Sequence, residues 1–339
     1  MPLPLIPFII AGAAAASAAV AGKKGYDSYQ NMQETKELAQ SLESKYKKAY
    51  KNFEVGRDET NETFEKYGLL KLDILDCSMK DFVDTFKQIK NVNFKGEAVT
   101  DNFVSSSDIN QFVLNIEKQV LKAGQVMTAG IASLAGGGLA AMGAVGATTT
   151  FAAASTGTAI ASLSGIAAQN ATLAFLGGGA LSAGGLGIAG GTLVLGGIAL
   201  APALAIGSLI FASSTEKKLE KMYEKKAEVN AEVEKLYSAA NVMAQIKTTT
   251  RNMHSLADST NKLFLENISK MKVIIKQNGE NFSCYSTEEQ KIIHNNYKLA
   301  IIMRDILNTT IIDERGKLIP NLQSVITAEK RKISAIKGY

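Results

Sequence analysis

Apolar residues in the last third of the chain recur at alternating steps of three and four positions, the spacing that places side chains along one face of an α-helix. Residues 215–278 contain neither glycine nor proline, so they predict one helix of 64 residues. Its seam has heptad-like spacing and comprises Val229, Val233, Leu236, Ala240, Met243, Leu256, Thr260 and Leu263. Three consecutive threonines at 248–250 propagate a helix less well, so the sequence also allows a break at these positions. Asn278 followed by Gly279 predicts the end of the helix.

The first third of the chain shows the same periodicity in two segments. A long amphipathic helix is predicted over 23–53 and a second helix over 60–90. Between them, Gly56 and the polar residues that follow it predict a bend. Strand and hairpin signals are sparse throughout, so the predicted fold class is all-α, with long amphipathic helices on either side of a central apolar region.

Polar residues at helix starts indicate three more helices. Ser107 or Asp108 can cap a helix that continues directly into the centre of the chain. A capping-box pattern begins at Ser286 and predicts a helix through about Leu307. A connector follows, and a last basic helix is predicted to end near Ile336.

The centre of the chain has a different composition. Residues 123–215 form 93 consecutive positions without Asp, Glu, Lys, Arg or His, and they hold 20 of the 29 glycines of the 339-residue chain. A run of about 18 apolar residues is already a candidate membrane span. The composition therefore divides the chain into an apolar segment 1–22, an amphipathic region 23–122, the uncharged region 123–215 and a coiled-coil region 216–339.

Small residues in the uncharged region recur every four positions. The upstream stripe includes Ala132, Gly136, Ala140 and Ala144, and the downstream stripe consists of Gly179, Ala183, Gly187 and Gly191. Such stripes let helix backbones approach closely in lipid, where helix association depends on packing. We expect close-packed apolar hairpins with a turn at Gln169 and Asn170 and a kink at Pro202. A Gly/Ala-rich hairpin buried inside a water-soluble sheath is the alternative.

Lysines flank both apolar segments of the chain. They are Lys23 and Lys24 after the first segment, and Lys118, Lys122, Lys217, Lys218 and Lys221 around the second. Lysines at both ends of the central region predict that both flanks stay on one side of a membrane, with an even number of crossings. Residues 1–22 lack the basic start of a signal peptide and contain three prolines, so we expect a retained membrane-associated segment. A cleaved signal and a buried apolar helix are the alternatives.

Charge and motifs argue against several functions. The net charge of +5 suits an anionic membrane surface, but lysines interleaved with carboxylates do not make a nucleic-acid footprint. The two cysteines do not form a disulfide framework. The two histidines lack metal-ligand spacing, and no phosphate-binding loop pattern occurs. The sequence therefore predicts no enzyme, no cofactor and no metal site.

The block 156–213 resembles a family of mostly uncharacterised bacterial proteins in which a glycine-zipper segment lies between long coiled coils. The residues that carry the resemblance are the turn at 170–174, the Gly177, Gly178, Gly179 cluster and Pro202. The resemblance covers about a sixth of the chain and implies an architecture without a settled activity. More loosely, the layout is similar to α-helical pore-forming toxins and to apolipoprotein-L-like proteins.

These observations support three hypotheses. The first is a bacterial membrane-active protein of the cytoplasm and inner membrane, or alternatively a secreted one. It would insert its glycine-zipper hairpin into a lipid bilayer, form a homo-oligomer and permeabilise the membrane as a toxin or defence effector. The second is a constitutive membrane scaffold or remodelling protein with a coiled-coil partner, such as a dynamin-like GTPase. The third is a soluble all-α interaction module.

Overall fold

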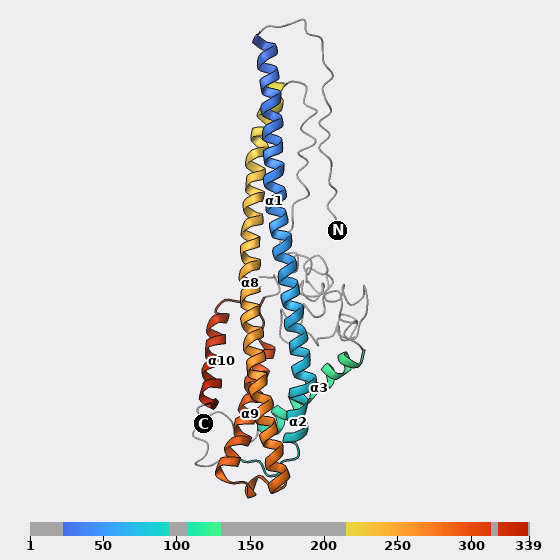
Figure 1. The fold of residues 1–339 in the computed structure, drawn as a ribbon, viewed down its shortest axis with the longest axis vertical. Helices are drawn as coiled ribbons and strands as arrows, with labels where there is room; N and C mark the ends of the chain where they lie inside the picture. Colours follow the sequence, from blue (N-terminus) through green and yellow to red (C-terminus); the bar gives the residue numbers. More distant parts are fainter. Residues whose placement is uncertain (1–22, 95–107, 130–214, 313–317, 338–339) are drawn as a thin grey trace. The chain divides into compact units, whose positions relative to one another are not determined.

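The computed structural model describes residues 23–94, 108–129, 215–312 and 318–337. This part of the chain is helical and contains no strand, which confirms the all-α prediction for the described residues; its only β-type pairings are two isolated bridges. The elements are α1 (Lys23–Ile74), η1 (Leu75–Met79), α2 (Lys80–Phe86), α3 (Asp108–Ala129), α8 (Thr215–Asn278), η6 (Phe282–Cys284), α9 (Thr287–Asn308) and α10 (Leu322–Lys337) (Figure 1). Among these helices, none is both long and apolar enough to cross a bilayer.

The long helix predicted at 215–278 is confirmed with the same bounds and without a break. The threonine triplet is accommodated because its hydroxyls bond back to the helix. Thr250 donates to the carbonyl of Ile246 at 2.8 Å and Thr248 to that of Ala244 at 2.9 Å. The helix stops at Gly279, whose φ of 75° lies in the left-handed region that glycine adopts without strain.

The capping box at the start of α9 is also confirmed. The Ser286 hydroxyl accepts from the Glu289 N–H, and the Glu289 carboxylate accepts from the Ser286 N–H at 2.8 Å. These bonds hold the Glu289 carboxyl pKa below its usual value, since they favour the charged form. The last two helices end within one residue of the predicted positions, at Asn308 and Lys337.

The bend predicted at Gly56 is wrong, because α1 continues without interruption to Ile74. The buried apolar face of α1 passes through this position: Ala49 and Phe53 are buried just before it, and Gly56 itself faces Met243 of α8. Burial of a continuous apolar face against another helix outweighs the low helix propensity of one glycine. The helix predicted over 60–90 is divided among the end of α1, the π-helical turn η1 and α2.

Replacing Gly56 with alanine is expected to stabilise the protein by ~0.5–1 kcal/mol, the usual gain from removing a glycine from a helix interior. An added Cβ would lie 3.8 Å from the Met243 Cβ, which is an ordinary van der Waals contact. Thermal unfolding followed by circular dichroism measures the gain. A lower melting temperature for Gly56→Ala than for the unmodified protein would contradict the prediction.

The chain divides into two compact units. The described parts of unit 1 are α1 up to Asp58 and α8 up to Met243. Its core lies between the two helices and consists of Ala39, Leu42, Ala49 and Phe53 from α1 and Met222, Val229, Val233, Leu236, Ala239 and Met243 from α8. Tyr223 donates to Glu34, and Lys45 donates to Asn230 at 3.3 Å. The residue numbers rise together along both helices, so the pair is parallel.

Unit 2 contains the rest of α1 and α8 together with η1, α2, α3, α9 and α10. Tyr297 of α9 is 1% exposed and lies at the centre of an aromatic cluster. Its ring centroid is 5.1–5.8 Å from those of Phe86, Phe94 and Phe112, which come from three different segments. The helix α9 is antiparallel to α8, and α10 packs against α9. This core determines where α3 lies.

Candidate functional site

The residues predicted to pack in the membrane lie outside the described residues. They are Ala132, Gly136, Ala140, Ala144, Gly179, Ala183, Gly187 and Gly191, with the turn at Gln169 and Asn170 and the kink at Pro202. The flanking lysines lie on described helices. Lys23 and Lys24 begin α1, Lys217, Lys218 and Lys221 lie in the first two turns of α8, and Lys118 and Lys122 lie on α3.

Helix α3 leads the chain into the uncharged region, and its two faces differ. The inner face is buried in the core of unit 2 and comprises Ile109, Phe112, Val113, Ile116, Val120 and Ala123. The outer face carries the exposed Lys118 and Lys122 together with Leu114 and Leu121, which are 47% and 62% exposed. Two large apolar side chains are thus exposed beside two lysines on the outer face of α3.

Specific contacts hold α3 against unit 2. The Phe112 ring lies 5.1 Å from the Tyr297 ring at an interplanar angle of 68°, and the Arg304 guanidinium carbon lies 5.1 Å from the Phe112 centroid. Lys87 forms an ion pair with Glu117 at 2.8 Å. Because that pair is partly exposed, it contributes at most ~1 kcal/mol, and the aromatic contacts and apolar burial dominate the docking.

The end of α3 approaches the π-helical turn η1 closely. A Cβ added at Gly124 would lie 3.3 Å from the Asp76 carboxylate oxygen, which is closer than most Cβ contacts. Single π-turns inside helices are frequent at functional sites, because the extra residue interrupts the regular hydrogen bonding. Here the turn lies against Ala123 and Gly124, the first two residues of the uncharged region, and Ala123 is fully buried.

Two polar side chains of α1, Lys71 and Tyr67, lie fully inside unit 2. The Lys71 Nζ is 4.6 Å from the centroid of the Tyr67 ring, and the Tyr67 hydroxyl donates to the carbonyl of Ile306 at 3.4 Å. Burial lowers the pKa of Lys71 to about 7, because the charged ammonium loses its hydration. Burial also raises the pKa of the Tyr67 hydroxyl.

Sequence reasoning missed the burial of Lys71, although a signal was present. Tyr67, Lys71 and Ile74 are separated by four and three positions and so continue the apolar seam of α1. A lysine on the apolar face of a seam predicts either a break in the seam or a buried amine. A buried lysine of near-neutral pKa can act as a nucleophile. Here the side chain is 0% exposed, which leaves no access for a substrate.

A groove of about 480 Å³ lies between the end of α2 and the start of α3. It is lined by Phe86, Lys87, Ile89, Asn91, Val92, Ile109, Asn110, Val113 and Leu114. Lys87 is the one titratable side chain of this lining, and it is paired with Glu117. The groove therefore holds no acid–base pair or nucleophile of the kind that hydrolysis or group transfer requires.

The two histidines lie beside aromatic rings, and the two cysteines are free thiols. His294 is buried, with its ring 4.7 Å from that of Phe94, and His254 lies 6.2 Å from the Tyr67 ring. Among the described residues, His, Cys, Asp and Glu form no group of three that could hold a metal ion. Cys77 and Cys284 are free and exposed. Partial burial and the neighbouring Asp73 raise the Cys77 pKa, so its thiol is a weaker nucleophile than usual.

The described part of the chain thus offers no catalytic constellation, but it does show how the uncharged region is joined to the helices on either side. On the N-terminal side, α3 is docked in unit 2 by its apolar face. On the C-terminal side, α8 begins at Thr215 in unit 1. Comparison of the chain with protein-family models, with curated proteins and with solved structures found no match.

Proposed function

We propose that this is a membrane-active protein that inserts the uncharged region 123–215 into a lipid bilayer and oligomerises through its small-residue stripes. The assembly forms a pore or permeabilises the membrane, as a toxin or a defence effector would. One observation carries the proposal: 93 consecutive residues lack any charge, and they lie between helices that are rich in charge. As helices, such a stretch would be stable across a bilayer, because a helix satisfies its own backbone groups there.

The geometry of α3 supports this function. The helix extends through Ala129, so the first residues of the uncharged region already continue a helix begun in the charged sequence. Ala123 is fully buried against unit 2, whereas Leu114 and Leu121 on the outer face of α3 are exposed. The start of the uncharged region is thus sheltered by the core of unit 2, from which insertion would release it.

The small-residue stripe provides the test of oligomerisation. Leucine at both Gly187 and Gly191 fills the stripe, keeps the helix apolar and prevents close backbone approach. We expect the double variant to bind vesicles of phosphatidylcholine and phosphatidylserine but to lose the large oligomer that the unmodified protein forms on them. Leakage of a trapped dye should fall at least tenfold, since a pore needs the assembly. Sedimentation in mild detergent and dye fluorescence measure the two effects.

The matched control places the same leucines at Gly185 and Ala189, which are also four positions apart. These positions lie about 200° around a helix from Gly187 and Gly191, so the added volume does not fill the stripe. The control should assemble and release dye as the unmodified protein does. If Gly187→Leu with Gly191→Leu leaves oligomer size and leakage unchanged, assembly through the stripe is wrong.

A further inference from the structure

The helices α1 and α8 of unit 1 run in the same direction with a nearly constant register. Glu34 bonds to Tyr223 and Lys45 to Asn230, with sequence separations of 189 and 185 residues. Gly56 lies against Met243 further along the same pair. A register so nearly constant over more than twenty residues defines a parallel coiled-coil pair, and Figure 1 shows both helices beginning at the same end of it.

Because of this register, the first residues of α1 and α8 lie opposite each other in the pair. With a separation of about 189 residues, Thr215 lies opposite residue 26 of α1, one turn from the start of α1 at Lys23. The apolar segment 1–22 joins α1 at this end, and the uncharged region 123–215 joins α8 at the same end. The starts of α1 and α8, to which the two apolar segments are joined in the sequence, therefore lie at the same end of the pair.

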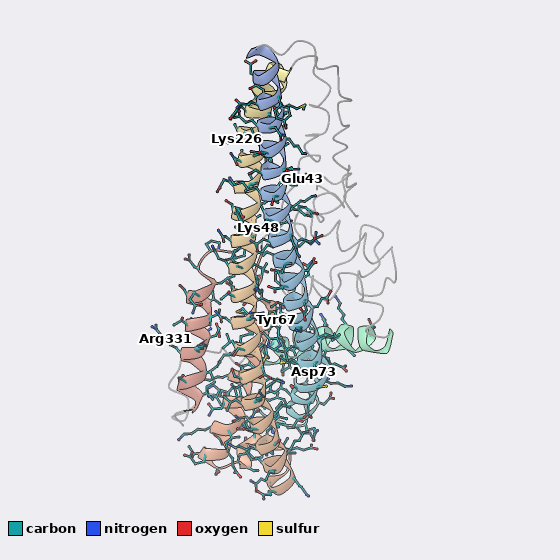
Figure 2. The ribbon with its side chains drawn as sticks, turned by 45° about the horizontal axis from the view of Figure 1, so that its top comes forward. Glu43, Lys48, Tyr67, Asp73, Lys226 and Arg331 are labelled. Carbon is teal, nitrogen blue, oxygen red and sulfur yellow. The ribbon has the colours of Figure 1, made fainter. Side chains whose placement is uncertain are left out.

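Positive charge gathers at this end in the sequence of both helices. Residues 23–33 and 215–222 contain five lysines and three carboxylates. Lys23 and Lys24 come directly after the first apolar segment, and Lys217, Lys218 and Lys221 come directly after the second. Lysines next to an apolar segment are the residues that remain at a membrane surface, where anionic headgroups attract them. Figure 2 shows Lys226 of α8 in the next turns of the same pair.

We propose that the N-terminal end of the α1/α8 pair is a docking end for an anionic lipid bilayer and delivers both apolar segments to one membrane surface. This inference rests on the proposed membrane insertion and adds its geometry. We call Lys23, Lys24, Lys217, Lys218 and Lys221 the basic collar, because in the sequence they are the lysines that begin the two helices next to the apolar segments. The parallel pair then extends away from the membrane, and residues 1–22 and the end of the uncharged region start from the same side.

Fluorescent labels at two levels of the pair test this geometry. Cys77 and Cys284 are exposed and are first replaced by serine. Single cysteines then replace the exposed Met32 or Glu220 near the proposed docking end, or the exposed Asn52 or Asn241 in the same register further along. The two levels are twenty residues apart on α1, or about 30 Å. Vesicles of phosphatidylcholine and phosphatidylserine carry a nitroxide quencher on their headgroups.

We expect strong quenching of the labels at 32 and 220 and little quenching at 52 and 241 when the full chain is bound to the vesicles. Equal quenching at both levels would mean that the pair lies flat on the membrane, and quenching on only one of the two helices would mean that the apolar segments insert apart. Either result would contradict the proposal that this end of the pair docks on the membrane. Both results can occur while the protein still releases dye, so this inference can fail while the proposed function still holds.

The basic collar has its own test. Charge reversal of Lys217, Lys218 and Lys221 to glutamate should weaken binding to phosphatidylserine vesicles by about 100-fold, because each lysine near an anionic surface contributes to binding. The matched control reverses Lys47, Lys48 and Lys51, three exposed lysines further along α1, and makes the same change in net charge. An equal loss of binding in both triple variants would show that only net charge matters and would contradict the collar.

Discussion

Replacing Lys71 with methionine is expected to raise the free energy of unfolding at pH 7 by ~2–4 kcal/mol. Burial lowers the pKa of this lysine from 10.5 to about 7, which corresponds to a penalty of about 4 kcal/mol at pH 7. Methionine has a similar length and carries no charge, so it removes the penalty. The loss of the contacts of the ammonium group, including the one with the Tyr67 ring, offsets part of the gain.

The same substitution should flatten the dependence of stability on pH. Below pH 7 the amine is charged in both the folded and the unfolded protein, so the full penalty is present. Between pH 7 and 10 the unfolded protein holds the proton and the folded protein has released it, so stability rises with pH. The effect should be measured below pH 10, because Tyr67, whose pKa is raised, contributes the opposite slope above that pH.

Urea unfolding of both proteins between pH 7 and 9.5 measures these effects. The matched control is Lys66→Met, which removes an exposed lysine of the same helix. Lys66 is paired with Glu62 at 2.7 Å, and both side chains are more than 60% exposed, so the control should change stability by less than ~1 kcal/mol. A Lys71→Met protein that is less stable, with the slope against pH unchanged, would contradict the buried-amine account.

A disulfide between residues 76 and 124 is expected to block dye release by the oxidised protein. A Cβ built at Gly124 would lie 3.3 Å from the Asp76 carboxylate oxygen, so the two residues are neighbours, and we expect cysteines at both positions to form a disulfide. The bond ties the end of α3 to the turn η1. Ala123 then stays in the core of unit 2, and the start of the uncharged region cannot enter lipid.

Reduction provides the internal control for this experiment. The variant Asp76→Cys with Gly124→Cys is prepared with serine at Cys77 and Cys284, so that no other disulfide forms. Leakage should return when a reducing agent opens the bond, and the single Asp76→Cys variant should release dye under either condition. Equal leakage from the oxidised and reduced double variants would mean that α3 remains docked while the hairpin acts.

The elements that sequence reasoning predicted correctly are those governed by local chemistry. The bounds of α8 follow from an unbroken run without glycine or proline, and its end follows from Gly279, whose positive φ suits a helix stop. The capping box of α9 depends on two side chains three positions apart. Such signals need no knowledge of what the helix packs against, which is why they can be recognised in the sequence alone.

The missed features depend on contacts between distant segments. Gly56 predicted a bend, but its neighbour in space is Met243, which no local pattern reveals. The heptad-like seam of α8 did not identify what packs against it, or in which direction. Parallel pairing within one chain needs a long return connection, and here nearly 190 residues separate the paired positions. For the site, the positions of Lys118 and Lys122 on an exposed face follow from periodicity, whereas the docking of α3 on Tyr297 does not.

Dye release from vesicles of phosphatidylcholine and phosphatidylserine by the full chain, prepared without detergent, tests the central claim most directly. The account predicts release together with a vesicle-bound oligomer that sediments faster than the free protein. Vesicles that retain their dye, with the protein left free in solution, would contradict it and favour an all-α interaction module. A protein that binds firmly but never causes leakage would also contradict it and favour a permanent membrane scaffold.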